Sequence, residues 1–442
     1  MKLPERVLLC IQLLEDSGFS AYCVGGCVRD AQMGRVPHDY DLCTNAKPQQ
    51  ICEVFNQYPL VRNGEKHGTI GVVLEGEMLE ITTYRTEGGY TDSRHPDWVA
   101  FVDSITEDLA RRDFTINAMA YHPSQGYIDP FGGRQDLEKG LLRAVGDPQT
   151  RFREDALRIL RGVRFAARFH FAIDENTLDA MISCAPLMAS LARERVLSEL
   201  LGILPHIDAQ SLLRFAPVLT VVIPELAPCI DFQQNNPHHV YDVYRHIAHT
   251  VEALCGDETL RMAALLHDIG KPETYTLDSQ GIGHFYGHEK RSAEMANAIL
   301  LRLRTPTLFR EQVVLLIENH MILLLPDKKF LRRRCLKFGI ETVMQMAALQ
   351  RADMIATGTR STEELSSYDV VQQLLEDIRK ECSCLQLSDL AVNGADLIAL
   401  GIAPGPEIGK ILNRLLEQVV EETLPNNKAA LLAAVQIPGG SK

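Results

Sequence analysis

Two aspartates one residue apart, Asp39 and Asp41, form the first pattern in this 442-residue chain that could perform chemistry. On a strand, side chains at positions i and i+2 project from the same face, so the two carboxylates would lie side by side. Adjacent carboxylates repel each other unless a cation lies between them, and Mg²⁺ prefers hard oxygen ligands. Two such ions can bind the attacking and leaving oxygens of phosphoryl transfer. We therefore expect Mg²⁺ at Asp39 and Asp41; a polar strand end is the alternative.

A glycine pair, Gly25 and Gly26, lies upstream between a predicted strand and a predicted helix. Backbone N–H groups at such a turn can approach a phosphate closely, and Arg29 adds a bidentate partner. A glycine pair alone is a weak signal, but its position shortly before the aspartate pair makes the combination specific. Glu80, on a later predicted strand, is a candidate third catalytic carboxylate, and an exposed strand glutamate is the alternative.

A second pattern combines acids and arginines at helical spacing. Arg158 follows Glu154 by four residues and Asp155 by three, so these side chains share a surface on one predicted helix. An exposed helix with weak ion pairs is one interpretation. The other is base recognition, because cytosine and adenine both present an amino donor beside a ring-nitrogen acceptor. A carboxylate accepts from the first while arginine donates to the second, which selects C and A against U and G.

Histidine and aspartate form a third pattern in the second half of the chain. His246, the adjacent pair His267 and Asp268, and Asp353 lie on successive predicted helices. Imidazole and carboxylate together suit a transition metal such as Mn, Fe, Ni, Co or Zn. A single histidine among apolar residues is more often part of the core, so the prediction rests on the ordered set of four.

The elements that must position these residues change in type along the chain. We expect a helix from about residue 4 to 18, strands at 21–24 and 39–44, and a helix starting near residue 28. A hairpin is predicted from 69–74 and 78–83, and a helix over 107–121. After about residue 146 the pattern is helical. The fold class is therefore α+β, with an α/β head (residues 1–145), helical neck (146–230), helical metal-binding domain (231–360) and helical tail (361–442).

Composition limits the class of protein. A formal net charge of −13 argues against a protein that coats nucleic acid through bulk electrostatics. The 11 cysteines form no CxxC pair, and no apolar run is long enough to span a membrane, so we expect a soluble cytoplasmic protein without membrane contact.

In these motifs the sequence resembles class II tRNA nucleotidyltransferases and bacterial poly(A) polymerases of the polymerase β superfamily. The matching motifs occur in one order, at residues 24–30, 39–41, 107–118, 129–133 with 136–137, and 153–164. The resemblance implies a polymerase-β-like head that adds CMP and AMP from CTP and ATP to the tRNA 3′ end. A poly(A) polymerase, or an enzyme that adds only CC or only A, is the alternative within the class. Residues 92–96 resemble the family's flexible loop.

The resemblance also assigns roles to residues. Asp39 and Asp41 would bind the metal. The residues implied at the nucleotide are Gly26 and Arg29 at the phosphates, Arg112, the base-reading Asp155 and Arg158, and the supporting Arg161 and Arg164. Arg193, Arg195 and Glu199 resemble a further neck motif, with an ordinary surface helix as the alternative. The implied partners are tRNA, CTP and ATP, and we infer no obligate protein partner.

The histidine–aspartate set resembles the HD phosphohydrolase superfamily. His288 and His320 stand where related sequences add ligands for a second ion, whereas we interpret His238 and His239 as loop residues. This resemblance implies an additional hydrolase activity on phosphate esters. It also leaves two alternatives from other classes, a phosphohydrolase whose head only binds nucleotides and a non-catalytic RNA-binding adaptor. The intact head motifs argue against both.

Overall fold

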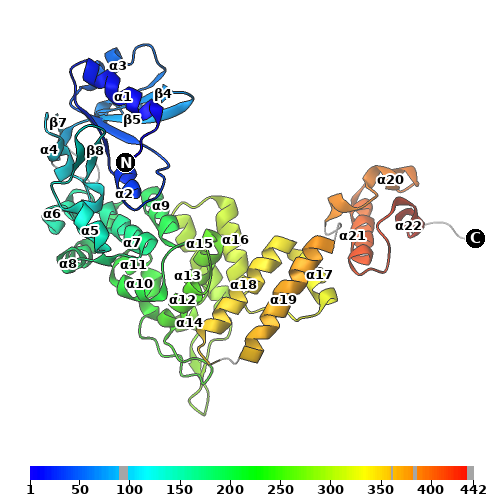
Figure 1. The fold of residues 1–442 in the computed structure, drawn as a ribbon. Helices are drawn as coiled ribbons and strands as arrows, with labels where there is room; N and C mark the ends of the chain where they lie inside the picture. Colours follow the sequence, from blue (N-terminus) through cyan, green and yellow to red (C-terminus); the bar gives the residue numbers. More distant parts are fainter. Residues whose placement is uncertain (89–97, 360–361, 382–385, 436–442) are drawn as a thin grey trace, which may run out of the picture. The chain divides into compact units, whose positions relative to one another are not determined.

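The computed structural model describes residues 1–88, 98–359, 362–381 and 386–435. Within it the chain forms two compact units. The first comprises Met1–Ile207 with Arg214–Pro224, and the second comprises Asp208–Leu213 with Glu225–Lys442. Figure 1 shows strands and helices mixed in the N-terminal part of the chain and mainly helices from there on. The four-domain division stays a prediction, and the predicted loop at 92–96 lies outside the described residues.

A seven-stranded sheet forms the centre of the first unit, in the order β3-β4-β5-β2-β1-β8-β9. Its strands are β1 (Ala21–Val24), β2 (Asp41–Thr44), β3 (Leu60–Val61), β4 (Thr69–Leu74), β5 (Glu77–Thr83), β8 (Ala120–His122) and β9 (Gly126–Ile128). Two strand pairs lie outside it: β6 (Arg85–Gly88) with β7 (Trp98–Phe101), and β10 (Leu141–Leu142) with β11 (Ala172–Ile173). The helices up to the neck are α1 (Glu5–Asp16), α2 (Gly26–Gln32), α3 (Pro48–Val54), η1 (Glu65–His67), α4 (Ile105–Ala110), η2 (Thr115–Asn117) and α5 (Gly133–Glu138).

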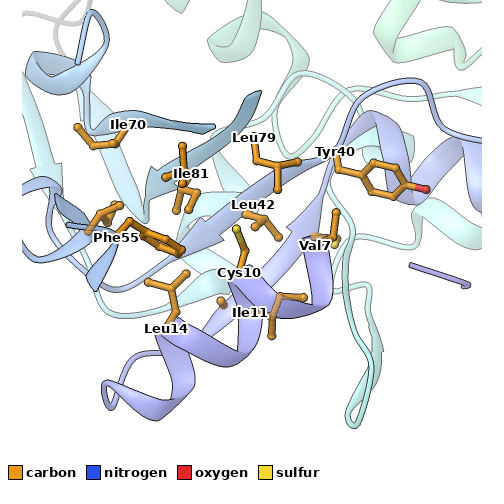
Figure 2. Close-up of a cluster of buried hydrophobic side chains, with 14 of the residues drawn as sticks. Val7, Cys10, Ile11, Leu14, Tyr40, Leu42, Phe55, Ile70, Leu79 and Ile81 are labelled. Carbon is orange, nitrogen blue, oxygen red and sulfur yellow. The ribbon is translucent and has the colours of Figure 1, made fainter. Parts of the chain in front are cut away.

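At β1 both faces of this sheet are buried, which explains why the strand is apolar along its whole length. Ala21 and Cys23 belong to one core cluster, which α1 and α3 also line, while Tyr22 and Val24 belong to another. The alternation follows from the two-residue period of a strand. In Figure 2 side chains of α1 gather against the strand residue Leu42 in the first cluster.

The predicted hairpin is confirmed, and its turn explains the strand register. β4 and β5 are joined by Glu75 and Gly76, whose φ angles are 52° and 83°. Two consecutive residues with positive φ are typical of the two-residue turn that matches the twist of paired strands. The helix at 4–18 and the strand at 21–24 are also confirmed, as α1 and β1. The strand predicted at 39–44 begins later, at Asp41.

The helix predicted over 107–121 is wrong. α4 ends at Ala110, and the chain continues as the short helix η2 and the strand β8. Helical periodicity is interrupted because Phe114 is fully buried and bridges to Ala144. Asp113 Oδ1 accepts hydrogen bonds from the Phe114 backbone and from Asn117 Nδ2. Such local bonds compete with helical ones.

The neck helices complete the first unit and contain a second correction. They are α6 (Pro148–Glu154), α7 (Leu157–Phe169), α8 (Glu175–Cys184), η3 (Ala185–Ser190), α9 (Arg193–Ile203) and α11 (Ala216–Val222). All of α10 (Ala209–Arg214) except Arg214 belongs to the second unit. The single helix predicted through Glu154, Asp155 and Arg158 is two helices. Asp155 is extended (φ −142°, ψ 103°), and its Oδ1 accepts from the Leu157 backbone at 3.0 Å. This side-chain turn separates α6 from α7.

The second unit is almost entirely helical. Its elements are η4 (Pro224–Cys229), α12 (Val243–Glu252), α13 (Glu258–Leu266), α14 (Lys271–Thr274), β12 (Thr276–Leu277), β13 (Gly283–His284), α15 (His288–Arg302), α16 (Thr307–Glu318), α17 (Lys328–Phe338), α18 (Ile340–Ala356), α19 (Thr362–Glu381), η5 (Leu387–Asp389), α20 (Gly394–Ala399), α21 (Pro406–Val420) and α22 (Lys428–Ala433). α12 packs against α13 and α18, and α15 against α16. α20, α21 and α22 share a separate core. None of the helices in the described part of the chain is long and apolar enough to cross a membrane.

Candidate active site and metal-binding cluster

The turn between β1 and α2 requires glycine at position 25. Gly25 has φ 72° and ψ −128°, a conformation that side chains rarely adopt. A Cβ atom there would lie 2.9 Å from Nη1 of Arg112. Backbone and guanidinium therefore approach each other closely at this turn. Gly26 is the first residue of α2, which begins two residues earlier than expected.

Three carboxylates meet beside this turn. β2 and β5 pair in parallel, which places Asp41 directly opposite Glu80, and Asp39 lies two residues before Asp41 in the preceding loop. Tyr40 between them is buried, so the aspartates point away from the core. Partial removal from water raises the pKa of Asp41, and the carboxylates of Glu80 and Asp39 raise it further against the opposing charge of Arg112. Mutual destabilisation of carboxylates fits a site that binds a divalent cation.

Arg112 is held in place by a buried acid. Its Nη2 lies 3.2 Å from Asp108 Oδ2, and Arg111 Nη2 lies 2.7 Å from Asp108 Oδ1. Burial alone would raise the pKa of Asp108, but the two guanidinium groups bring it below its ordinary value. Asp108 therefore stays ionised and fixes both arginines at the end of α4.

The side chain of Arg29 is buried and has several partners within the protein. It is 6% exposed, and its guanidinium donates to Asp30 and to Asn117, the latter at 2.7 Å. It also lies over the rings of Phe165 and Phe169. These contacts give it a structural role, and phosphate contact by Arg29 stays a prediction.

The two residues expected to read the base do not pair with each other. Asp155 Oδ2 lies 2.8 Å from Arg195 Nη2. Arg158 donates to Glu154 at 2.8 Å and to the carbonyl of Arg111 at 3.0 Å. Each side chain is thus fixed by its own partner. The expected ion pair of Arg158 with Glu154 is observed, and the pairing of Arg195 with Asp155 gives the neck arginine a definite place.

Arg161 and Arg164 are also held by acids. Arg161 Nη2 lies 2.8 Å from Asp113 Oδ2, and Arg164 Nε lies 3.3 Å from Glu199 Oε2. Burial would raise the pKa of Asp113, but Arg161 together with the other donors lowers it to about 2. The Arg161 guanidinium therefore has an ionised partner at neutral pH.

A cavity of about 480 Å³ brings most of the predicted residues together. Eight arginines and three aspartates are among its lining residues, so its field is positive although the whole chain is negative. The predicted residues that line it are Gly26, Arg29, Asp41, Arg112, Asp155, Arg158, Arg161 and Arg164. Asp39 and Glu80 adjoin it through Asp41 rather than lining it.

Sequence reasoning missed several residues of this site. Asp113 and Asn117 lie within the motif at 107–118, but a predicted helix gave them no role. Arg195 was left between two interpretations, and Phe165 had no signal beyond its four-residue spacing from Arg161. All four line the cavity.

The second unit brings the four predicted metal ligands together. His246 Nε2 lies 2.8 Å from Asp353 Oδ1 and 3.3 Å from Asp268 Oδ2. His267 Nε2 lies 3.2 Å from Asp268 Oδ2. Three of the residues are less than 2% exposed, and Asp353 is more open. The ends and faces of α12, α13 and α18 therefore form one buried cluster.

Backbone carbonyls orient the histidines of this cluster. The Nδ1 atoms of His267, His288 and His320 lie 2.8, 2.8 and 2.6 Å from carbonyl oxygens three residues earlier in each case. A carbonyl accepts from a protonated Nδ1, which leaves the Nε2 lone pair directed at the cluster, as in metal sites. Burial lowers the pKa of His320 to about 4, so its ring is neutral.

The ligand atoms form two groups that share one residue. His246, His267 and Asp268 make the first, and Asp268, His288 and His320 make the second. Two carboxylates in so buried a cluster attract positive charge. Burial alone would lower the pKa of His267, but the neighbouring carboxylates of Asp268 and Asp353 raise it. A divalent cation would meet the same demand, so the residues fit a metal.

His239 is part of this site, although the sequence suggested only a loop residue. Its ring lies 5.2 Å from that of His246 and perpendicular to it. Burial lowers its pKa to about 3. A cavity of about 450 Å³ is lined by His239, Asp268, Asp353 and Lys271, whose Nζ lies 2.7 Å from Asp268 Oδ2. The one sequence signal that could have placed His239 in the cluster was its position seven residues before His246.

Comparisons with known proteins agree with the fold of the chain. Residues 21–143 match the family model "Poly A polymerase head domain", and residues 170–230 match "Probable RNA and SrmB- binding site of polymerase A". Residues 283–435 match domain 2 of tRNA nucleotidyltransferases. A crystal structure of the Bacillus stearothermophilus CCA-adding enzyme in complex with CTP is 28% identical, with a TM-score of 0.71 over 98% of this chain and 97% of that one. The Thermotoga maritima CCA-adding enzyme, at 21% identity and a TM-score of 0.58, shares the fold.

Relatives align over nearly the whole chain. The CCA-adding enzyme of Latilactobacillus sakei is 34% identical over 98% of both chains. That of Levilactobacillus brevis is 36% identical over 436 residues, again 98% of both chains. With this identity along its full length, the chain belongs to the CCA-adding enzyme family of tRNA nucleotidyltransferases.

Proposed function

We propose that this protein adds CMP and AMP from CTP and ATP to the 3′ end of tRNA, so that a CCA end is completed or repaired. The observation that carries the proposal is the single cavity in which Asp41 lies with Asp155 and Arg158. A transferase that works without a nucleic-acid template needs a reaction centre and a base-reading surface in one place. The scattered free cysteines fit a reducing compartment such as the cytoplasm.

In the reaction the tRNA 3′-hydroxyl attacks the α-phosphorus of the nucleotide. The new O3′–Pα bond forms as the bond from Pα to the bridging oxygen breaks. Pyrophosphate leaves with the electron pair, and the proton of the hydroxyl passes to solvent. Asp39 and Asp41 would hold Mg²⁺, which supplies Lewis-acid stabilisation to phosphoryl transfer. Glu80 would add a third carboxylate beside these two, and Arg112 would balance charge on the triphosphate.

Base selection follows from the donors and acceptors that the structure holds ready. Each carboxylate oxygen of Asp155 accepts one protein hydrogen bond and has a second lone pair for the amino group of C or A. Three of the five N–H donors of Arg158 bond Glu154 and the carbonyls of Arg151 and Arg111. The remaining donors can reach a ring nitrogen.

The test uses purified protein, a tRNA transcript that lacks CCA, and labelled CTP and ATP supplied singly and together. We expect two cytidines with CTP alone, and one terminal adenosine only when both are present. Long A tracts with ATP alone would identify a poly(A) polymerase, and addition limited to CC or to A would identify a partial enzyme. No addition by the folded protein would reject the proposal.

The His/Asp cluster supports a second function, hydrolysis of a phosphate ester. His246, His267, Asp268 and Asp353 would hold a transition ion, and His288 with His320 would complete a site for a second one. Such ions supply Lewis-acid chemistry. Within the protein, Lys271 lies beside Asp268 and faces the same cavity, where it can bind a phosphate oxygen.

Metal analysis and activity tests examine this second function. Protein purified without chelator should contain Mn, Fe, Ni, Co or Zn by mass spectrometry, and the His267→Ala variant should contain less. Phosphomonoesters and 2′,3′-cyclic phosphates are the substrates to test. Equal metal content in the two proteins would reject the site.

A further inference from the structure

Two stacked phenylalanines lie under the arginines of the nucleotide cavity. Phe165 and Phe169 are one helical turn apart on α7 and are 3% and 7% exposed. Their ring centroids are 6.0 Å apart and the ring planes differ by only 6°. The rings therefore form one continuous aromatic surface, which we name the phenylalanine platform.

Five guanidinium groups surround this platform. Their carbon atoms lie within 5.6 Å of a ring centroid: Arg29 at 5.3 Å from Phe165 and 4.9 Å from Phe169, Arg161 and Arg164 at 5.2 and 5.4 Å from Phe165, and Arg35 and Arg168 at 5.2 and 5.6 Å from Phe169. Energetically significant cation–π pairs occur roughly once in 70–80 residues of ordinary protein. Six on two adjacent rings make this cluster exceptional within the chain.

The arginines come from two parts of the fold. Arg29 and Arg35 belong to α2 and the loop after it, next to the Gly25 turn, whereas the other three belong to α7. The platform therefore joins the turn expected at the phosphates to α7, the helix that begins shortly after Asp155 and contains Arg158.

Three of these arginines also pair with a carboxylate: Arg29 with Asp30, Arg161 with Asp113 and Arg164 with Glu199. The aromatic rings differ from these acids in charge. Neighbouring guanidinium groups repel each other, and a carboxylate that relieved the repulsion would also repel a triphosphate. The negative face of a phenylalanine ring attracts the cation without adding net charge. A guanidinium above a ring can still donate N–H bonds from its edge.

We propose that Phe165 and Phe169 are positioning residues for the triphosphate of the incoming nucleotide, because they hold the cavity arginines in place while the cavity stays positive. This rests on the proposed nucleotide addition for the identity of the ligand. The rings would act on the triphosphate through the guanidinium groups rather than by direct contact with it.

The experiment changes the charge of the ring face and little else. Phenylalanine with one, two or three ring fluorines is incorporated at position 165 or 169 of the full chain, which weakens the negative ring face stepwise at nearly constant volume. Phe152 receives the same series as a matched control, because it is fully buried and contacts Phe114 within the same unit. Calorimetry gives the Kd of inorganic tripolyphosphate, and steady-state kinetics give KM and kcat for CTP.

We expect each trifluorinated platform ring to weaken tripolyphosphate binding about twofold to fivefold, with intermediate values for fewer fluorines. KM for CTP should rise in parallel while kcat changes less. A Kd that does not depend on fluorine number, an equal effect at Phe152, or a wild-type protein that does not bind tripolyphosphate would overturn the proposal. The binding assay is independent of catalysis. A graded Kd in a protein that adds no nucleotides would reject the proposed function and keep the platform.

Discussion

Replacing Asp155 by asparagine should relax the choice of base. Asparagine keeps a carbonyl oxygen that can accept from the Leu157 backbone at the break between α6 and α7. Its amide group replaces the oxygen that now lies 2.8 Å from Arg195. An amide N–H donates where the carboxylate accepted, so the amino group of cytosine loses its partner and the carbonyl of uracil gains one.

The size of the effect follows from one hydrogen bond in a partly buried site. Asp155 has a side chain that is 19% exposed, so the loss should cost about 1–3 kcal/mol in discrimination. The ratio of kcat/KM for CTP to kcat/KM for UTP should therefore fall about tenfold to a hundredfold. The assay is incorporation of a single labelled nucleotide into a tRNA that lacks CCA. The ratio is the relevant quantity, because loss of the ion pair with Arg195 can lower kcat/KM equally for both nucleotides.

Asp147→Asn is the matched control, since it makes the same chemical change at the N-cap of α6, whose C-cap is Asp155. Asp147 caps α6 through Thr150 and does not line the cavity. Its variant should keep the wild-type ratio. An unchanged ratio in Asp155→Asn, with rates high enough to measure, would show that the base is read elsewhere.

Three further results are expected. Asp41→Ala should reduce C and A addition together by roughly 10²–10³-fold or more while tRNA binding in a gel-shift assay persists, and near wild-type rates would contradict the metal assignment. Asp113→Asn should lower the free energy of unfolding by about 2 kcal/mol at neutral pH, because the pKa of Asp113 is lowered to about 2 in the folded state. The difference in unfolding free energy should be complete above pH 4 and disappear as the pH falls toward 2. Urea titrations at each pH measure it. A difference that does not change with pH would refute the lowered pKa of Asp113 as its cause. His267→Ala combined with Asp268→Ala should remove any phosphatase or phosphodiesterase activity and leave nucleotide addition nearly intact, whereas hydrolysis that survives would place its site elsewhere.

Local patterns in the sequence predicted those parts of the site that depend on local structure. The Gly25 turn, the spacing of Asp39 and Asp41, and the β4–β5 hairpin each depend on a few consecutive residues. The order of His246, His267, Asp268 and Asp353 also sufficed, because ligands on packed helices need only the right face of each helix. For these features the residue types and their spacing contain most of the information.

Features that depend on distant partners could not be predicted in this way. Glu80 lies opposite Asp41 because β2 and β5 pair in parallel, and no local pattern specifies a pairing between strands so far apart in the chain. The helix expected over 107–121 fails for a similar reason. Its apolar residues recur at helical spacing, but Phe114 is buried through a bridge to Ala144.

The break at Asp155 shows how a distant partner changes the geometry of the proposed base-reading residues. In a continuous helix Asp155 and Arg158 would lie one turn apart and form an ion pair with each other. Few of their hydrogen-bonding groups would then be left for a base. The extended conformation of Asp155 instead directs its carboxylate to Arg195 of α9, and Glu154 pairs with Arg158. Each residue is then oriented by a different partner, and an acceptor and a donor can face one ligand together. Under the proposed base-reading roles of Asp155 and Arg158, selection of C and A depends on a helix that ends where its apolar periodicity would continue.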